Sequence, residues 1–267
     1  MARGKKQIDG QLVFDFCIEP RNYVVQANTL IGGKQALKIN SAKLIRSAIM
    51  QVVYEDQDLK PYVISIDELS KLLGVSKTNL YRDIDDITDD IIKNPVYIRV
   101  DEADKKKTAW VKIPWVSICE YHSDVGVAIQ LNEKLKPYLL NLKEHYTQYA
   151  LENILAMKSV YAIRIFELLQ EQIKTRKLPV EGVDIELSVE QIKICCDCED
   201  KYAKFSHFKD KVLDVAVREI NSQTLYTVSY SYIKKGRSVV GIRFHVNMYY
   251  HIGIKEEWSK RRIPIQE

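Results

Sequence analysis

The stretch ISIDELSKLLGVSKTNLYRDIDDITDDII, residues 64–92, decides the fold. Ser65 is placed to cap a first helix that ends at Gly74, and Ser76 is placed to cap a second helix. Apolar residues recur on the second helix at intervals of four, three and four, the spacing of one buried face. These residues are Leu80, Ile84, Ile87 and Ile91. The stretch therefore predicts two helices joined by a tight turn.

A second stretch repeats this design: LSVEQIKICCDCEDKYAKFSHFKDKVLDVAVREI, residues 187–220. Ser188 is placed to cap a short helix, and a longer helix is expected from Lys204 to Ile220. The inner face of the longer helix is predicted to carry Phe205, Phe208, Val212, Val215 and Ile220. Each stretch is followed by β-branched and aromatic runs typical of a hairpin. Helix, turn, helix and hairpin is the order of a winged helix, whose second helix can enter the major groove of DNA.

The chain has 267 residues, enough for two domains of about 110–130 residues each. We therefore expect an α+β protein with two tandem winged-helix domains. The expected divisions are an N-terminal arm over 1–21, a first domain over 22–142, a second domain over 143–250 and a tail over 251–267.

Finer expectations concern single residues along this plan. Ser41 is expected to cap the first long helix, and Thr147 to cap a helix after the domain junction. Pro114 lies inside an expected strand over 109–119 and indicates an edge or a bulge. Within the second domain, a loop containing Pro179 and Gly182 is expected to lead to the helix that Ser188 caps. The segments LIRSAIMQV (44–52) and AIRIFELL (162–169) resemble each other, which fits a repeated unit.

Charge separates the two expected recognition helices. The net charge of the chain is +4 and its pI is about 8.6, a weak indication of nucleic-acid binding. From Ser76 to Ile91, two cations stand against five aspartates, whereas Lys204 to Ile220 has four cations and three acids. Duplex DNA carries one negative charge per about 1.7 Å of axis and would repel the acidic helix. We infer that the second unit is the main DNA reader, and that the first makes lighter contacts or serves protein association.

The candidate DNA-binding residues fall in three places. The outward face of the second recognition helix carries Lys204, Ser206, His207, Lys209, Asp210 and Lys211. The turn of the second hairpin carries Lys234, Lys235 and Arg237 around Gly236. The start of the first recognition helix carries Lys77, Thr78, Asn79 and Arg82. Such types bond phosphates and base edges, although a helix face with this composition is more often merely solvated.

Three further basic segments are ambiguous. The turn at 101–107 mixes three lysines with three acids, so contact with DNA is about evenly balanced there. The arm (Arg3, Lys5, Lys6) and the tail (Lys260, Arg261, Arg262) could reach phosphates or simply aid solubility.

Sequence signatures of enzymes fail at identifiable positions. Around Gly33 and Lys34 a P-loop would need a glycine at Asn28 and Ser or Thr at Gln35. The five histidines form no His-x-His pair, and no dinucleotide or hydrolase motif occurs. We expect no catalysis and no cofactor. Cys195, Cys196 and Cys198 lack the spacing of a zinc site and are expected to be buried thiols.

Compartment follows from what the chain lacks. Five cysteines without a secretory signal fit reduced thiols, and no run of 18 apolar residues could span a membrane. We expect a cytoplasmic protein without a membrane partner.

Three segments carry a resemblance to a known family: NYVVQANTL (22–30), LKPYLLNLKEHYTQYALENILAMKSVYAIRIFELLQ (135–170) and FKDKVLDVAVREIN (208–221). In this order and spacing the chain resembles the initiator replication proteins of iteron-containing plasmids. The resemblance implies two winged-helix domains, no enzymatic activity, and binding to repeated sites (iterons) in double-stranded origin DNA. It also implies opening of the origin, recruitment of host replication proteins, and a homodimer that represses its own gene.

Two other functions stay open at this point. A winged-helix transcription regulator without an origin function would use the same modules on a palindrome instead of direct repeats. A protein-interaction scaffold would bind no DNA, and a salt titration of duplex binding would separate it from both others.

Overall fold

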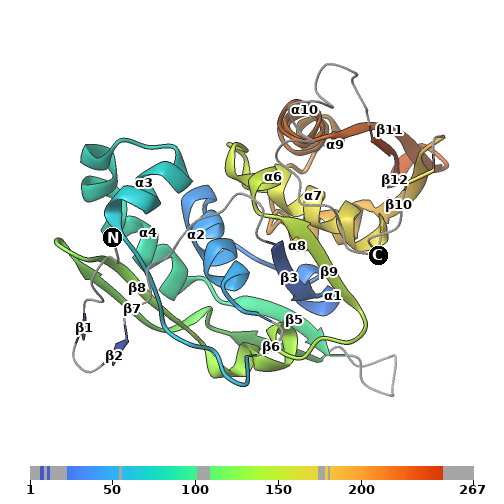
Figure 1. Ribbon diagram of the computed structural model, residues 1–267. Coiled ribbons are helices and arrows are strands. Elements are labelled where there is room, and N and C mark those ends of the chain that lie inside the picture. Colours follow the sequence, from blue (N-terminus) through green and yellow to red (C-terminus); the bar gives the residue numbers. More distant parts are fainter. Residues whose placement is uncertain are drawn as a thin grey trace.

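The computed structural model describes residues 23–53, 56–100, 109–173, 178–179 and 181–248, and the backbone of 7–8 and 11–12. The last two pairs form the short strands β1 (Gln7–Ile8) and β2 (Gln11–Leu12). Figure 1 shows the two halves of the chain packed side by side, the first around α2 and α4 and the second around α7 and α10.

The first unit is a winged helix. It comprises α2 (Ile39–Met50), β4 (Tyr62–Ile64), α3 (Ile66–Leu73), α4 (Lys77–Lys93), β7 (Val116–His122) and β8 (Gly126–Leu131). Its three strands form a sheet in the order β4-β8-β7. The predicted helix ends are confirmed: Ser65 and Glu68 form a capping box, Gly74 is left-handed with φ of 67°, and the Ser76 hydroxyl accepts from Asn79 N.

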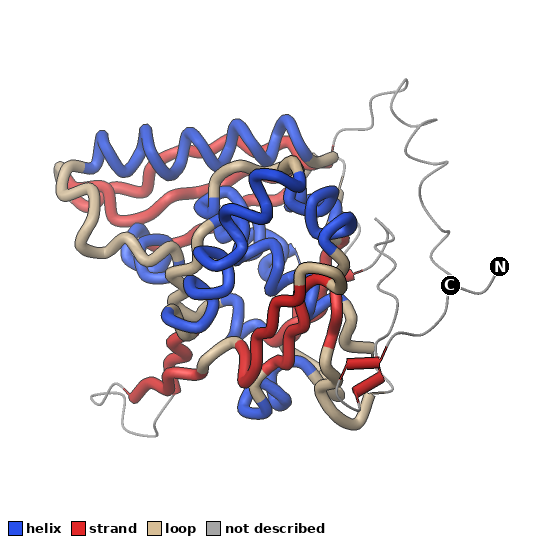
Figure 2. The backbone as a smooth tube through the Cα atoms, turned by 90° about the vertical axis from the view of Figure 1, so that its left-hand side faces the viewer, coloured by secondary structure: helices blue, strands red, loops and turns tan. Residues whose placement is uncertain are grey.

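The second unit repeats this topology. It comprises α7 (Val160–Ile173), β10 (Val183–Ser188), α8 (Val189–Cys195), α9 (Phe205–Phe208), the π-helical turn η2 (Lys209–Leu213), α10 (Asp214–Gln223), β11 (Tyr226–Lys235) and β12 (Ser238–Met248). The strand order β10-β12-β11 matches that of the first sheet. The tandem winged-helix fold is therefore confirmed. Figure 2 shows the helix over 205–223 lying along this sheet.

Further elements join and decorate the two units. They are β3 (Tyr23–Ala27), α1 (Asn28–Ile31), β5 (Val96–Val100), β6 (Ala109–Ile113), the 3-10 turn η1 (Glu133–Leu135), α5 (Lys136–Leu139), β9 (Tyr146–Ala150) and α6 (Glu152–Leu155). β3 pairs antiparallel with β9, so the start of the first half returns to the segment that leads into the second. The division at 142/143 stays a prediction.

A fully buried ionic cluster connects the halves. Glu167 on α7 accepts from Arg46 Nε and Nη2 on α2, each at 3.0 Å, and from Arg164 Nη1. Tyr149 Oη and Gln26 Nε2 donate to the same carboxylate at 2.6 and 3.0 Å. Arg46 and Arg164 occupy corresponding places in the two similar segments 44–52 and 162–169. Both helices thus direct a guanidinium at one carboxylate inside the molecule.

Several sequence expectations about local structure are wrong. Ser41 does not cap α2, because the helix begins earlier and Asp90 of α4 accepts from Lys38 N at 2.8 Å. Thr147 lies in β9, where its hydroxyl donates to Asn28. Pro114 sits between two strands of different sheets, so 109–119 is not one strand. The loop containing Pro179 and Gly182 is confirmed, but it is short, because Val183–Ser188 forms β10 by pairing with β12.

The π-helical turn corrects the expected inner face of the long helix. A π-helical turn contains one more residue than an α-helical turn, so the face that follows is rotated. The buried positions are Phe208, Val212, Leu213, Ala216 and Ile220. Phe205 and Val215 are only partly buried, whereas an unbroken α-helical period had placed both inside.

Candidate nucleic-acid interface

The β11–β12 hairpin forms a long, basic wing in the second unit. Lys235 pairs with Ser238, so Gly236 and Arg237 form a two-residue turn. Gly236 takes φ of 61° at the first turn position, where primed hairpin turns require a positive φ. Lys234, Lys235 and Arg237 are all exposed, and none pairs with a carboxylate in the part of the chain that the structure describes. The wing tip therefore presents three unpaired cations.

The start of the recognition helix in the second unit is exposed and polar. Ser206 and His207 lie on α9, Lys204 directly precedes it, and Lys211 lies within η2. All four side chains are exposed. These groups supply hydroxyl, imidazole and ammonium donors of the kind that contact base edges and phosphates.

Lys209 differs from its neighbours because two carboxylates hold it. Its Nζ lies 2.5 Å from Asp214 Oδ2 and 3.2 Å from Asp210 Oδ1. Tyr230 Oη on β11 donates to Asp214 Oδ1 at 2.5 Å, which joins the wing to the recognition helix. Burial opposes ionisation of Asp214, but the bonds from Lys209 and Tyr230 outweigh it and lower the pKa of Asp214. Lys209 is thus paired with acids of its own helix, and Asp210 stands beside it, exposed.

The first recognition helix presents its candidate residues differently. Lys77, Thr78, Asn79 and Arg82 are exposed at the start of α4. Lys77 Nζ lies 2.5 Å from Asp67, and Arg82 Nε lies 2.7 Å from Asp83. Both cations are therefore already neutralised, which the linear sequence does not reveal.

One of the five aspartates counted on α4 is not at the surface. Asp90 is buried, and its carboxylate accepts from Lys38 N and from Asn94 Nδ2. Of the other four, Asp85, Asp86 and Asp89 are exposed and Asp83 is half-buried. The surface of the first recognition helix is thus less acidic than the sequence count indicates, but its net charge is still negative.

The wing of the first unit is β7–β8. These strands pair with β4 as β11 and β12 pair with β10, whereas β5 and β6 form a separate two-stranded sheet. The basic turn at 101–107, for which the sequence left contact with DNA evenly balanced, follows β5 and lies outside the described residues. So do the arm residues Arg3, Lys5 and Lys6, and the tail residues Lys260, Arg261 and Arg262.

The three clustered cysteines form no metal site with the other described residues. Cys195, Cys196 and Cys198 are buried, as expected. Within the described ranges, no three His, Cys, Asp or Glu side chains come close enough to hold a metal ion. In the same ranges no helix is both long and apolar enough to cross a membrane.

Comparison with known proteins adds three findings. A family model described as "Initiator Replication protein, WH1" matches residues 23–170, and one described as "Initiator Rep protein, WH2" matches residues 188–246. A curated "Replication initiation protein" of Escherichia coli is 22% identical over 246 residues, covering 91% of this chain and 75% of that protein. A solved structure, "Crystal structure of Pi initiator protein in complex with iteron DNA", matches with a TM-score of 0.70 at 16% identity. This match covers 88% of this chain and 100% of that chain.

Proposed function

The chain belongs to the initiator replication protein family, and we propose that it starts plasmid replication by binding iterons in duplex origin DNA. The similar solved protein was crystallised with iteron DNA, which supports this ligand class. The main support within this chain is that the second unit combines two features. Its wing carries cations that no carboxylate pairs with among the described residues, and its recognition helix begins with exposed polar side chains. The protein acts in this proposal by binding energy and catalyses no bond cleavage.

The second unit is the main DNA reader in this proposal. The Lys234, Lys235 and Arg237 side chains contact phosphates and fix the register of the protein on the duplex. The exposed residues Ser206 and His207 then lie where a recognition helix meets base edges, and Lys204 and Lys211 flank them. Lys209, held by Asp214 and Asp210, keeps the wing and helix in one orientation.

The first unit makes lighter contacts. Its cations at the start of α4 are paired, and three exposed aspartates, Asp85, Asp86 and Asp89, follow them. Contact there is limited to the first turn, with Thr78 and Asn79 nearest the duplex. We assign dimerisation to this unit, and origin opening, recruitment of host replication proteins and repression of the chain's own gene to the whole protein.

A binding titration tests the proposal. Fluorescence anisotropy would compare a duplex of direct repeats from the cognate origin with a scrambled duplex, at several salt concentrations. We expect tighter binding to the repeats and a log–log slope of about −0.9 per phosphate contacted. Equal binding to both duplexes would exclude an iteron reader. A preference for one palindrome over direct repeats would favour a transcription regulator, and no salt-dependent binding would favour a protein scaffold.

A further inference from the structure

The β5–β6 hairpin is an addition to the first winged helix. It lies between α4 and β7, whereas in the second unit α10 leads directly to β11. One face of the hairpin is anchored, because Val96, Ile98 and Ile113 are buried in the core. Figure 2 shows the hairpin projecting from the body of the molecule at the lower left. Since the repeated fold is complete without it, its outer face is free for another task.

The outer face carries two aromatic rings and two cations. Cross-strand pairing sets Tyr97 opposite Lys112 and Arg99 opposite Trp110, which places all four side chains on one face. Lys112 Nζ lies 4.7 Å from the centre of the Tyr97 ring and 4.8 Å from that of Trp110. The ring centres are 6.0 Å apart, and Trp110 is 57% exposed. A tryptophan so exposed, in contact with one cation, offers an aromatic surface on which a base can stack.

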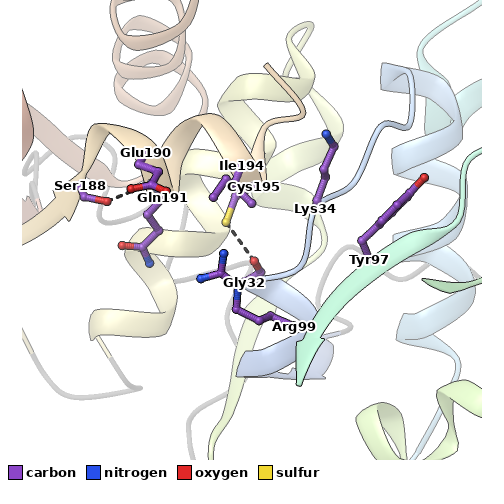
Figure 3. Close-up of a pocket in the computed structure, with 9 residues that line it drawn as sticks. All are labelled: Gly32, Lys34, Tyr97, Arg99, Ser188, Glu190, Gln191, Ile194 and Cys195. Atoms are coloured by element: carbon purple, nitrogen blue, oxygen red, sulfur yellow. Dashed lines mark hydrogen bonds between the residues drawn. The ribbon is translucent and has the colours of Figure 1, made fainter. Parts of the chain in front are cut away.

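A cleft extends this face toward the second unit. It encloses about 230 Å³ between Gly32, Lys34 and Arg99 on one side and Ser188, Gln191 and Ile194 of α8 on the other. Figure 3 shows the Arg99 side chain reaching from β5 toward α8. Lys34 is bound by Asp197 and Glu199, each at 3.0 Å. In the described parts of the chain, no carboxylate pairs with Arg99 or Lys112, so these two carry the free positive charge.

We propose that the outer face of the β5–β6 hairpin, together with this cleft, binds single-stranded DNA. Unpaired bases stack on Trp110 and Tyr97, and Arg99 and Lys112 contact the phosphates between them. Glu190 on the cleft wall accepts from the amino group of a base. The inference rests on the proposed function, because an initiator that opens its origin exposes such a strand.

Two observations favour a single strand over other partners. The bases of a duplex are stacked on one another, so exposed rings find a base face only where the strands have separated. A second copy docked through this face by a two-fold axis would bring Arg99 and Lys112 close to the same cations of the other copy. Among the residues that the structure describes, no carboxylate lies on this face to offset them.

The test measures binding of the full chain to a labelled 20-nucleotide single strand from the AT-rich part of the origin, and separately to the duplex repeats. Trp110→Ala should weaken single-strand binding by about 5- to 150-fold, the effect of losing one stacked base. Trp110→Phe should retain most of it, and duplex binding should change less than about twofold. The matched control is Ile118→Ala, which truncates an exposed apolar residue on β7 outside this face.

A second variant keeps the proposal testable if Trp110→Ala does not fold. Arg99→Gln with Lys112→Gln should make the salt slope for the single strand shallower by about 1.4, since each phosphate contact contributes about 0.7. Wild-type protein that binds the repeats but no single strand would overturn this inference and leave the proposed function standing. Unchanged single-strand binding by these variants would also overturn it. So would variants that become monomeric, as measured by molecular mass, but still bind the single strand like the wild type. Loss of repeat binding by the wild type would refute the proposed function itself.

Discussion

Glu167→Gln should lower the free energy of unfolding more than a Glu→Gln substitution at an exposed position. The wild-type carboxylate is 0% exposed, and among the described residues no other negative group is bonded to Arg46 or Arg164, which are also buried. Substitution by Gln keeps the shape but leaves two guanidinium charges uncompensated inside the molecule. Removing one partner of a buried pair costs about 3–5 kcal/mol. At about 2–4 °C per kcal/mol for a chain of this size class, Tm should fall by about 6–20 °C.

The matched control is Glu186→Gln. Glu186 forms an exposed pair with Arg243, whose Nη2 lies 2.7 Å from the carboxylate, and such pairs contribute about 0–1 kcal/mol. Thermal unfolding followed by circular dichroism would compare both variants with the wild type. If Glu167→Gln melts within about 2 °C of Glu186→Gln, the buried cluster does not hold the two halves together as argued.

Acid unfolding gives the same cluster a second readout. Burial opposes ionisation of Glu167, but the charges of Arg46 and Arg164 and the hydrogen bonds to it prevail, and its pKa falls from 4.5 to about 2. A carboxyl group whose pKa is lowered by folding stabilises the protein fully at pH values above its pKa in the unfolded state. This contribution is lost as the pH falls through its pKa in the folded state. Wild-type stability should therefore decline between about pH 4.5 and 2. Glu167→Gln should lack this component.

Two further predictions concern the second unit. Lys234→Ala with Lys235→Ala should lower affinity evenly across duplex sequences and flatten the salt slope by about 1–2, measured by anisotropy. An unchanged slope would show that the wing tip does not contact the DNA phosphates. Lys209→Ala should weaken binding to specific and scrambled duplexes alike, because it releases the Asp210 and Asp214 carboxylates toward the DNA. A loss confined to the specific duplex in a competition assay would instead make Lys209 a base contact.

The fold was largely predictable from local signals. The Ser65, Gly74, Ser76 and Ser188 helix ends follow from side-chain capping and a left-handed glycine, which depend on neighbours in sequence. The strands β4 and β10 were missed because their hydrogen bonds come from β8 and β12, far along the chain. The helix over 205–223 was predicted, but its π-helical turn was not, since an apolar period does not report an inserted residue.

The candidate site divides in the same way. Exposure of Lys234, Lys235 and Arg237 was predictable, because a glycine turn between two strands projects into solvent. The pairing of Lys209 with Asp214 was not, because it depends on the π-helical turn and on Tyr230 from the neighbouring strand. The joint role of Arg46 and Arg164 was hinted at by the repeated helices, but their shared partner appears only in three dimensions.

The most direct test of the account is the ratio of affinities for repeat and scrambled duplexes in two double variants. Ser206→Ala with His207→Ala removes the exposed polar groups of the second recognition helix. Lys77→Ala with Arg82→Ala removes the paired cations of the first. We predict that the first variant lowers the ratio by about 5- to 150-fold, the value of a lost base contact, and that the second leaves it within about threefold. A ratio that collapses only in the Lys77/Arg82 variant would contradict the account.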